Sequence, residues 1–460
     1  MKSIGLHWFR RDLRFDGNPA LLRNIEEMRG RVLCVFFFDA TFLSRPDFSV
    51  GRFAFFIKSL QSLKDQLRER GGDLLVLDDG PDAGFERILN LLDKHQLKPA
   101  LVTWNRDYEP FARLRDERIE RWLQKRDIKV LTERDHLICE PHEVLKDDGT
   151  PYRVFTPYYR KWKQFLATSG GRVRLAAPTA KDKINFELSW KRVDAKIPAL
   201  DRCDTFEKQN RRRLKINVPE AGTSEAFRVW KNFGHRLDAY KDLRDFPAHD
   251  ATSGLSIFFK NGSITTAQVL SRTNRHSASA EKFISEVAWR EFYYSILFNF
   301  PYVETESFNP KYRNIKWEND EKLFKKWKSG ETGFPLVDAG MRELVQTGRM
   351  HNRVRMVVAS FLVKDLHIDW RWGERFFMEH LLDGDLAANN GGWQWAASTG
   401  CDPQPYFRIF NPQSQAKKFD PENSYIQKWV PEFGTKNELR PIVNHAERAR
   451  RAVTLYRKLG

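Results

Sequence analysis

Residues 32–38 read Val-Leu-Cys-Val-Phe-Phe-Phe, and this stretch decides the fold class of the first part of the chain. A continuous apolar run rich in β-branched and aromatic residues is typical of a strand covered on both faces, as in a parallel sheet. Similar short apolar runs occur at residues 3–8, 73–77, 100–104 and 127–132. The sequence therefore predicts five buried strands.

Between the second and third of these runs, apolar residues recur at the spacing of a helix. They are Phe53, Phe56, Ile57, Leu60, Leu63 and Leu67. Strands that alternate with helices form a doubly wound parallel sheet. We predict an α/β domain with a five-stranded parallel sheet over residues 1–135. No GxGxxG motif follows the first strand, so we do not expect a Rossmann dinucleotide site there.

The pattern of apolar and polar residues changes twice after this domain. Residues 136–205 contain isolated prolines and lysine-rich stretches, with helical spacing only around 158–166, and predict an interdomain linker. Strand signals are sparse from residue 206 onward, which predicts an all-α domain over 206–460. Its helical patterns lie at residues 279–299, 320–329, 336–347, 352–366 and 372–382. We also expect Thr223 and Ser224 to cap a helix that carries Phe227, Trp230 and Phe233.

The composition indicates which class of binding partner and which cellular compartment to expect. The 460 residues carry a net charge of +17 and 14 tryptophans, which favours a nucleic-acid partner, although a solvated basic surface gives the same charge. The four cysteines are scattered and the histidines lack metal-ligand spacing, so we predict no disulfide framework and no metal site. We find no signal peptide and no membrane-length apolar run, and we expect a cytoplasmic protein, nucleoid-associated if the source is bacterial.

Residues 383–395 read Asp-Gly-Asp-Leu-Ala-Ala-Asn-Asn-Gly-Gly-Trp-Gln-Trp and indicate a ligand site. A packed core has little use for this mixture, because each buried carboxylate or amide must find a hydrogen-bond partner. A polar aromatic ligand does have a use for it. Carboxylates and amides recognise ring nitrogens and hydroxyls, glycines allow close approach, and indoles stack.

Three segments upstream carry further polar patterns. Residues 252–256 place small hydroxyl residues around a glycine, which suits an anion but is also common in ordinary turns. Glu286 and Trp289 share one helical face, where they are able to bind and stack on a base. The alternative is a buried indole beside a surface carboxylate. We expect Arg355 to pair with Asp383, because a buried carboxylate needs a counter-charge.

Together these segments resemble the photolyase/cryptochrome family, most closely its class I cyclobutane pyrimidine dimer photolyases. The resemblance rests on Trp-Phe-Arg-Arg-Asp-Leu-Arg at residues 8–14, Thr-Ser-Gly-Leu-Ser at 252–256, Glu-Val-Ala-Trp-Arg-Glu-Phe-Tyr at 286–293 and the stretch at 383–395. It covers nearly the whole chain. It implies an FAD-dependent carbon–carbon lyase for DNA repair, in which light drives an electron from reduced FAD into a flipped-out cyclobutane pyrimidine dimer and splits it into monomeric pyrimidines.

The resemblance also assigns roles to individual residues. Cofactor-binding positions are Tyr240, Thr252, Ser253, Gly254, Leu255, Ser256, Arg355, Asp383, Gly384, Asp385 and Asn389. Positions that bind DNA or the lesion are Glu286, Trp289, Arg290, Tyr293, Asn352, Arg353, Trp395 and Gln415. Catalytic positions are Glu286, Asn352, Met356 and Asn389. An electron-transfer chain runs from Trp393, nearest the flavin, through Trp370 to Trp317 at the surface.

Two alternatives within the family remain open. (6-4) photolyases resemble this chain but carry histidines at the positions of Asn352 and Met356, which favours cyclobutane dimers here. Plant-type cryptochromes, which signal without repairing DNA, carry aspartate where this chain has Asn389. The region of Asp16-Gly17 and Phe111-Ala112 departs from relatives, so a second, antenna chromophore stays open between a deazaflavin, a folate, a flavin and none. We expect a monomer that binds dimer-containing DNA and no membrane.

Overall fold

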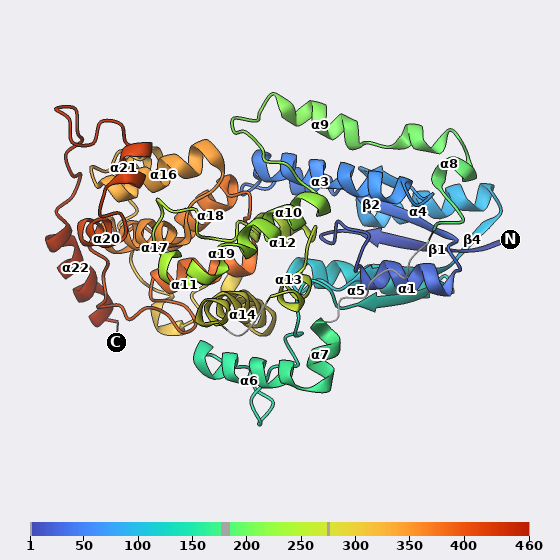
Figure 1. Cartoon of the computed structure of the whole chain (residues 1–460), viewed down its shortest axis with the longest axis horizontal. Coiled ribbons are helices and arrows are strands. Elements are labelled where there is room, and N and C mark those ends of the chain that lie inside the picture. Colours follow the sequence, from blue (N-terminus) through green and yellow to red (C-terminus); the bar gives the residue numbers. More distant parts are fainter. Residues whose placement is uncertain (1, 176–184, 274–276, 460) are drawn as a thin grey trace.

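The computed structural model describes residues 2–175, 185–273 and 277–459. Its first part is a five-stranded parallel sheet in the order β3-β2-β1-β4-β5, which confirms the predicted fold class (Figure 1). The strands are β1 (Lys2–Phe9), β2 (Val32–Phe37), β3 (Leu74–Leu77), β4 (Leu97–Asn105) and β5 (Lys129–Glu133). Each predicted strand is present, and the ends differ by at most three residues.

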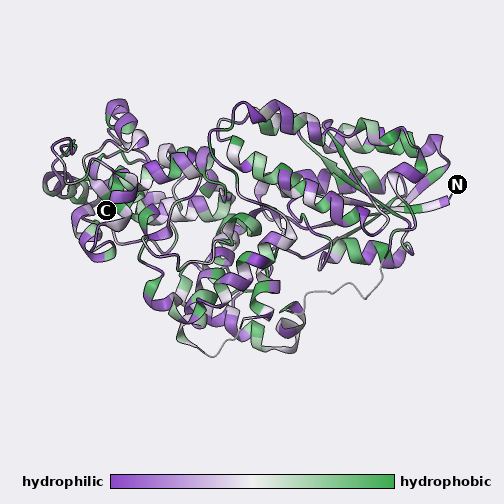
Figure 2. Cartoon of the chain, turned by 45° about the horizontal axis from the view of Figure 1, so that its top comes forward, coloured by the Kyte–Doolittle hydropathy of each residue, from purple (hydrophilic) through white to green (hydrophobic). Residues whose placement is uncertain are grey.

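Helices cover both faces of this sheet, which explains why its strands are apolar throughout. One face packs against α1 (Pro19–Glu27) and α3 (Val50–Arg68). The other packs against α4 (Gly80–Lys94) and α5 (Pro110–Gln124). In Figure 2 the strands are largely hydrophobic, whereas the covering helices mix hydrophobic and hydrophilic residues.

The second part is helical, and the described residues after 206 contain no strand, as predicted. The helices that matter for the site are α12 (Ser256–Asn261), α14 (Ala278–Asn299), α17 (Asn352–Ser360), α18 (Trp370–His380) and α19 (Leu386–Ala396). The others are α10 (Thr223–Gly234), α11 (Tyr240–Leu243), α13 (Thr266–Ser271), α15 (Glu321–Ser329), α16 (Pro335–Thr347), α20 (Pro412–Phe419), α21 (Ser424–Trp429) and α22 (His445–Arg457). Among the described residues, no helix combines the length and apolarity that a membrane crossing requires.

Two helix ends differ from the sequence prediction. The pattern at 352–366 is helical, but its last turn, Phe361–Asp365, widens into a π-helix. The predicted cap of α10 is wrong, because Thr223 is already the first helical residue and no side chain caps this end. Gly222 precedes it with a φ of 93°, so a glycine in a left-handed conformation makes the turn instead.

The segment at 136–205 is anchored to both parts of the molecule. Its helix α6 (Phe155–Ala167) lies along α14, where the buried Glu291 carboxylate accepts hydrogen bonds from the Trp162 indole at 2.7 Å and from the Cys139 amide at 3.1 Å. Further along, the Trp190 indole donates to the Cys34 carbonyl of β2 at 2.7 Å. Figure 1 shows α6 beneath α14 and α9 (Cys203–Arg211) above α3. The proposed boundaries at 135 and 205 stay predictions.

Candidate functional site

The acidic stretch before α19 meets the hydroxyl-rich segment at 252–256. Arg355 donates to both carboxylate oxygens of Asp383, at 3.0 and 3.1 Å, so the predicted ion pair is present. The Ser256 hydroxyl also bonds to this carboxylate. Burial alone would raise the pKa of Asp383, but Arg355 and the Ser256 hydroxyl outweigh it and lower the pKa. The fold therefore brings two predicted cofactor-binding segments together around an ionised carboxylate.

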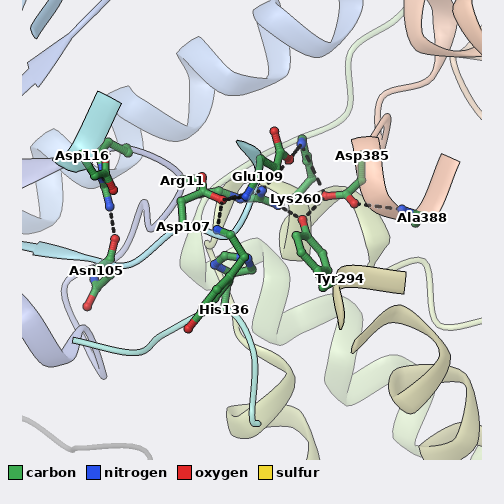
Figure 3. A network of polar contacts seen from close by, with 12 residues as sticks. Arg11, Asn105, Asp107, Glu109, Asp116, His136, Lys260, Tyr294, Asp385 and Ala388 are labelled. Atoms are coloured by element: carbon green, nitrogen blue, oxygen red, sulfur yellow. Dashed lines mark hydrogen bonds and ion pairs between the residues drawn. The ribbon is translucent and has the colours of Figure 1, made fainter. Parts of the chain in front are cut away.

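Asp385 is the N-cap of α19, and its carboxylate joins the two parts of the molecule (Figure 3). One oxygen accepts from the Ala388 amide at 3.2 Å. The other accepts from the Tyr294 hydroxyl at 2.5 Å and from Arg11 at 2.9 Å, with Lys260 at 3.4 Å. The sequence prediction did not find this role for Arg11, although Arg11 lies in the quoted motif at residues 8–14.

Helix α19 has one packed face and one open face. A methyl group added at Gly391 would lie 2.1 Å from the Tyr293 ring, so α14 packs closely there. A methyl group added at Gly392 would meet no atom within 4 Å. Asn389 and Trp395 lie three residues before and after Gly392, so they border the same open face. An open face with an amide, an indole and acidic residues at its start fits a planar polar cofactor such as a flavin.

Glu286 and Trp289 lie on α14 with neighbours that the sequence prediction missed. The Glu286 carboxylate forms an ion pair with Arg244 and another with Lys282 at 3.0 Å. The Trp289 ring stacks on Phe155 with centroids 3.8 Å apart and planes 11° apart. One indole face is therefore covered by the segment expected to be a linker, and helical spacing within α14 gave no sign of this contact.

The start of α17 joins the same region. Arg353 forms an ion pair with Asp245 at 2.9 Å, and Asp245 lies 3.7 Å from the guanidinium of Arg244. Asn352 is exposed, and its amide nitrogen lies 3.9 Å from the Met356 sulfur, so the two share a face as expected. A row of alternating charges thus links α17 to Glu286.

Other predicted residues lie elsewhere or have other partners. Arg290 donates to the His136 carbonyl at 2.8 Å and so points toward the connecting segment. Gln415 lies on α20, where its side-chain oxygen is buried without a hydrogen-bond partner. A methyl group added at Gly384 would lie 2.2 Å from the end of the Arg52 guanidinium, so this glycine lies close to α3. Tyr240 is buried between Phe233 and Phe283. The binding roles of these residues stay predictions.

The three tryptophans of the predicted chain belong to one apolar cluster. Trp393 is buried, packs against Phe377 with centroids 4.9 Å apart, and abuts Gly373. Trp370 is the first residue of α18, one turn before Gly373. Trp317 is partly buried and contacts Tyr456 with centroids 6.4 Å apart. Electron transfer along this route stays a prediction.

One group of side chains among the described residues has the spacing of metal ligands. Glu140, His142 and Glu143 place their ligand atoms within 4.8 Å of one another. Arg106 binds Glu140 at 2.7 Å, and Arg174 binds Glu143. Both carboxylates therefore have protein partners already. The four cysteines are unpaired.

Comparison with known proteins identifies the class of the molecule. The model of the FAD binding domain of DNA photolyase matches residues 283–439, and the DNA photolyase model matches residues 5–179. The helical half is therefore an FAD-binding domain. The chain belongs to the DNA photolyase family.

Individual relatives match over nearly their whole length. Deoxyribodipyrimidine photo-lyase from Synechococcus sp. is 37% identical over 99% of this chain and 96% of its own length. The archaeal photolyase from Sulfolobus tokodaii, solved with two FAD molecules, is 32% identical with a TM-score of 0.82, over 99% of this chain and 100% of that chain. A cryptochrome from Synechocystis sp. is 23% identical with a TM-score of 0.86, over 99% of both chains, and shares the fold.

Proposed function

We propose that this protein repairs DNA in light by splitting cyclobutane pyrimidine dimers. Membership of the photolyase family and the name of the Synechococcus relative support repair as the activity. The observation that carries the substrate assignment is the placement of Glu286 and Trp289 on the helix that packs against the FAD-bearing α19. Reduced FAD, when bound and illuminated, supplies the electron that opens the cyclobutane ring.

Glu286 recognises the flipped pyrimidine pair in this proposal. A carboxylate accepts hydrogen bonds from base N–H groups, and the partly buried Trp289 offers an indole ring for stacking. In the free protein Arg244 and Lys282 compensate the charge of Glu286. Because a dimer is already poorly stacked in the duplex, flipping it costs less than flipping normal bases.

Asn352 and Met356 support cyclobutane dimers as the lesion. Neither an amide nor a thioether transfers a proton near neutral pH, whereas an imidazole does. Ring opening of a cyclobutane dimer needs an electron but no net proton. A pair of side chains without acid–base function is therefore compatible with this lesion.

A second chromophore that collects light is part of the proposal, and its identity stays open between a deazaflavin, a folate and a flavin. The Sulfolobus relative with two FAD molecules supports a flavin as one choice. An absorption spectrum together with the flavin content per chain identifies the chromophore, because a deazaflavin and a folate have bands of their own and a flavin antenna gives two flavins per chain. FAD bands alone at one flavin per chain would remove the antenna from the proposal.

The test is a repair assay with two substrates. Protein with chemically reduced FAD is mixed with an oligonucleotide that carries either a cyclobutane dimer or a (6-4) photoproduct, in blue light and in the dark. We expect restored thymines only from the cyclobutane dimer and only in light. Restoration of the (6-4) lesion alone would make the protein a (6-4) enzyme. Restoration of neither, with reduced FAD present, would favour a signalling cryptochrome.

A further inference from the structure

The motif at residues 8–14 has a role beyond the α/β domain. It begins in the last two residues of β1 and continues past the carboxyl end of this strand, and residues 106–109 follow the carboxyl end of the neighbouring β4. In doubly wound sheets this is the point where strand order reverses and where ligands usually bind. Here the edge of the sheet is filled by contacts with the helical half (Figure 3).

Arg11 makes the central contact of this junction. One end of its guanidinium donates to Glu109 at 2.8 Å within its own domain. The other end crosses to the helical half and donates to the Tyr294 hydroxyl at 2.7 Å and to Asp385 at 2.9 Å. The side chains of Arg11 and Asp385 are 13% and 9% exposed, so removing one partner leaves a poorly solvated charge.

The carboxylate that Arg11 holds also starts α19. The second oxygen of Asp385 caps this helix at the Ala388 amide, one residue before Asn389. Burial alone would raise the pKa of Asp385, but the positive charges of Lys260 and Arg11 hold it well below its usual range. Arg11 thus influences both the position of the helix start and the charge at the FAD-binding face.

The same motif reaches the second predicted cofactor-binding segment. The Leu13 amide donates to the Asn261 carbonyl at 3.0 Å, and Arg14 donates to the Gly262 carbonyl at 3.1 Å. Asn261 is the last residue of α12, which begins at Ser256. Residues 11–14 therefore contact both helices that carry predicted FAD-binding residues, α12 and α19.

We propose that Arg11 is a positioning residue of the FAD site, which acts through Asp385 to fix the start of α19 and to balance the charge beside the flavin. It follows that the α/β domain, besides holding any antenna, tunes the cofactor of the other domain. The proposal rests on FAD binding by the helical half and is independent of which lesion is repaired.

The test compares Arg11→Gln, Arg11→Lys and the control Arg113→Gln in the full-length protein. Arg113 is a matched control because it also crosses from the α/β domain to the helical half, where it donates to the Phe298 carbonyl at 3.4 Å, but it does not contact α19. FAD affinity is measured by titration and the flavin midpoint potential by dye-coupled reduction. No DNA is present, so a failure here is distinct from a failure of repair.

For Arg11→Gln we expect the FAD dissociation constant to rise on the order of tenfold. We also expect a lower midpoint potential, because the less balanced negative charge of Asp385 opposes addition of an electron. Arg11→Lys keeps the charge, so we expect it to restore the flavin midpoint potential more fully than the FAD affinity. It replaces the glutamine variant if that variant does not fold. Arg113→Gln is expected to lower stability alone. A flavin potential in Arg11→Gln equal to that in Arg113→Gln would overturn the proposal, and so would an FAD affinity in Arg11→Lys equal to that of the original protein.

Discussion

The carboxylate of Glu286 lies between two cations before any DNA is present. Because of this arrangement, the effect of Glu286 on DNA affinity can be separated from its effect on repair. Replacing Glu286 frees Arg244 and Lys282 to interact with phosphates, so affinity for DNA need not fall. The hydrogen bonds that the carboxylate would accept from the dimer are lost, and with them its hold on the orientation of the pyrimidine pair.

For Glu286→Ala we therefore expect repair yield per absorbed photon to fall on the order of tenfold, with dimer affinity changed much less. Yield is measured on saturated protein–DNA complexes, and affinity by fluorescence anisotropy in the dark. Glu281→Ala is the matched control, because Glu281 lies on the same helix and pairs with Lys163 instead. An unchanged yield in Glu286→Ala would remove its proposed role.

Glu374 on α18 is a second acidic residue with an unusual environment. Its carboxylate accepts from the Asn390 amide at 3.2 Å, and its carbonyl accepts from the Asn389 amide at 3.0 Å. Burial raises its pKa from the ordinary 4.5 to about 7. Between these two pH values the folded protein holds a proton on Glu374, whereas the unfolded chain has released it. The contribution of this group to the free energy of unfolding therefore falls as pH rises through this range.

For Glu374→Gln we expect this pH dependence to disappear. Above about pH 7 the free energy of unfolding should exceed that of the original protein by on the order of 1 to 2 kcal/mol, a figure that is reduced because the side chain is partly exposed. The unfolding midpoint is followed from about pH 4.5 to about pH 8. Glu321→Gln, on an exposed helix start, should retain the original slope. A slope in Glu374→Gln as steep as in the original protein would contradict the assignment.

At the scale of elements, α19 is the helix on which the site depends. Its two adjacent glycines face opposite surroundings, because Gly391 lies against the Tyr293 ring and Gly392 faces open space. A helix propensity scale assigns both positions the same cost, since both are glycines inside a helix. Packing gives them different surroundings, because Gly391 contacts α14 and Gly392 lies on the face where we propose that the cofactor binds.

We therefore expect Gly391→Ala to destabilise the protein by about 1–3 kcal/mol, because the added methyl group overpacks the contact with α14. Gly392→Ala should fold at least as well, with up to about 1 kcal/mol gained from helix propensity, but should bind FAD less tightly. Thermal unfolding of the FAD-free protein and FAD titration separate the two effects. Unchanged FAD affinity in Gly392→Ala would show that the cofactor does not use this face.

At the scale of the whole molecule, the net charge of +17 governs the encounter with DNA. Phosphate contacts release counterions, so affinity should decrease steeply as salt increases. Between about 50 and about 200 mM salt we expect affinity for undamaged duplex to fall on the order of a hundredfold. Dimer-containing DNA should follow a parallel line at higher affinity, because the stacking contact proposed for Trp289 is not ionic. Binding without salt dependence would contradict a phosphate-based interface.

The sequence determined the parts of this protein that depend on local pattern. Continuous apolar runs such as 32–38 fixed the parallel sheet, because a strand buried on both faces has no place for polar residues. The order of motifs identified the family, and the need of buried Asp383 for a counter-charge predicted its ion pair with Arg355.

Only the tertiary structure decided which distant residues meet. Phe155 covers one face of Trp289, Arg244 pairs with Glu286, and Arg11 holds Asp385 across the domain junction. Helical or strand periodicity reports whether a residue faces a core, but not which segment forms that core. These contacts depend on how elements far apart in the chain are oriented when they pack, and that orientation is a property of the whole fold.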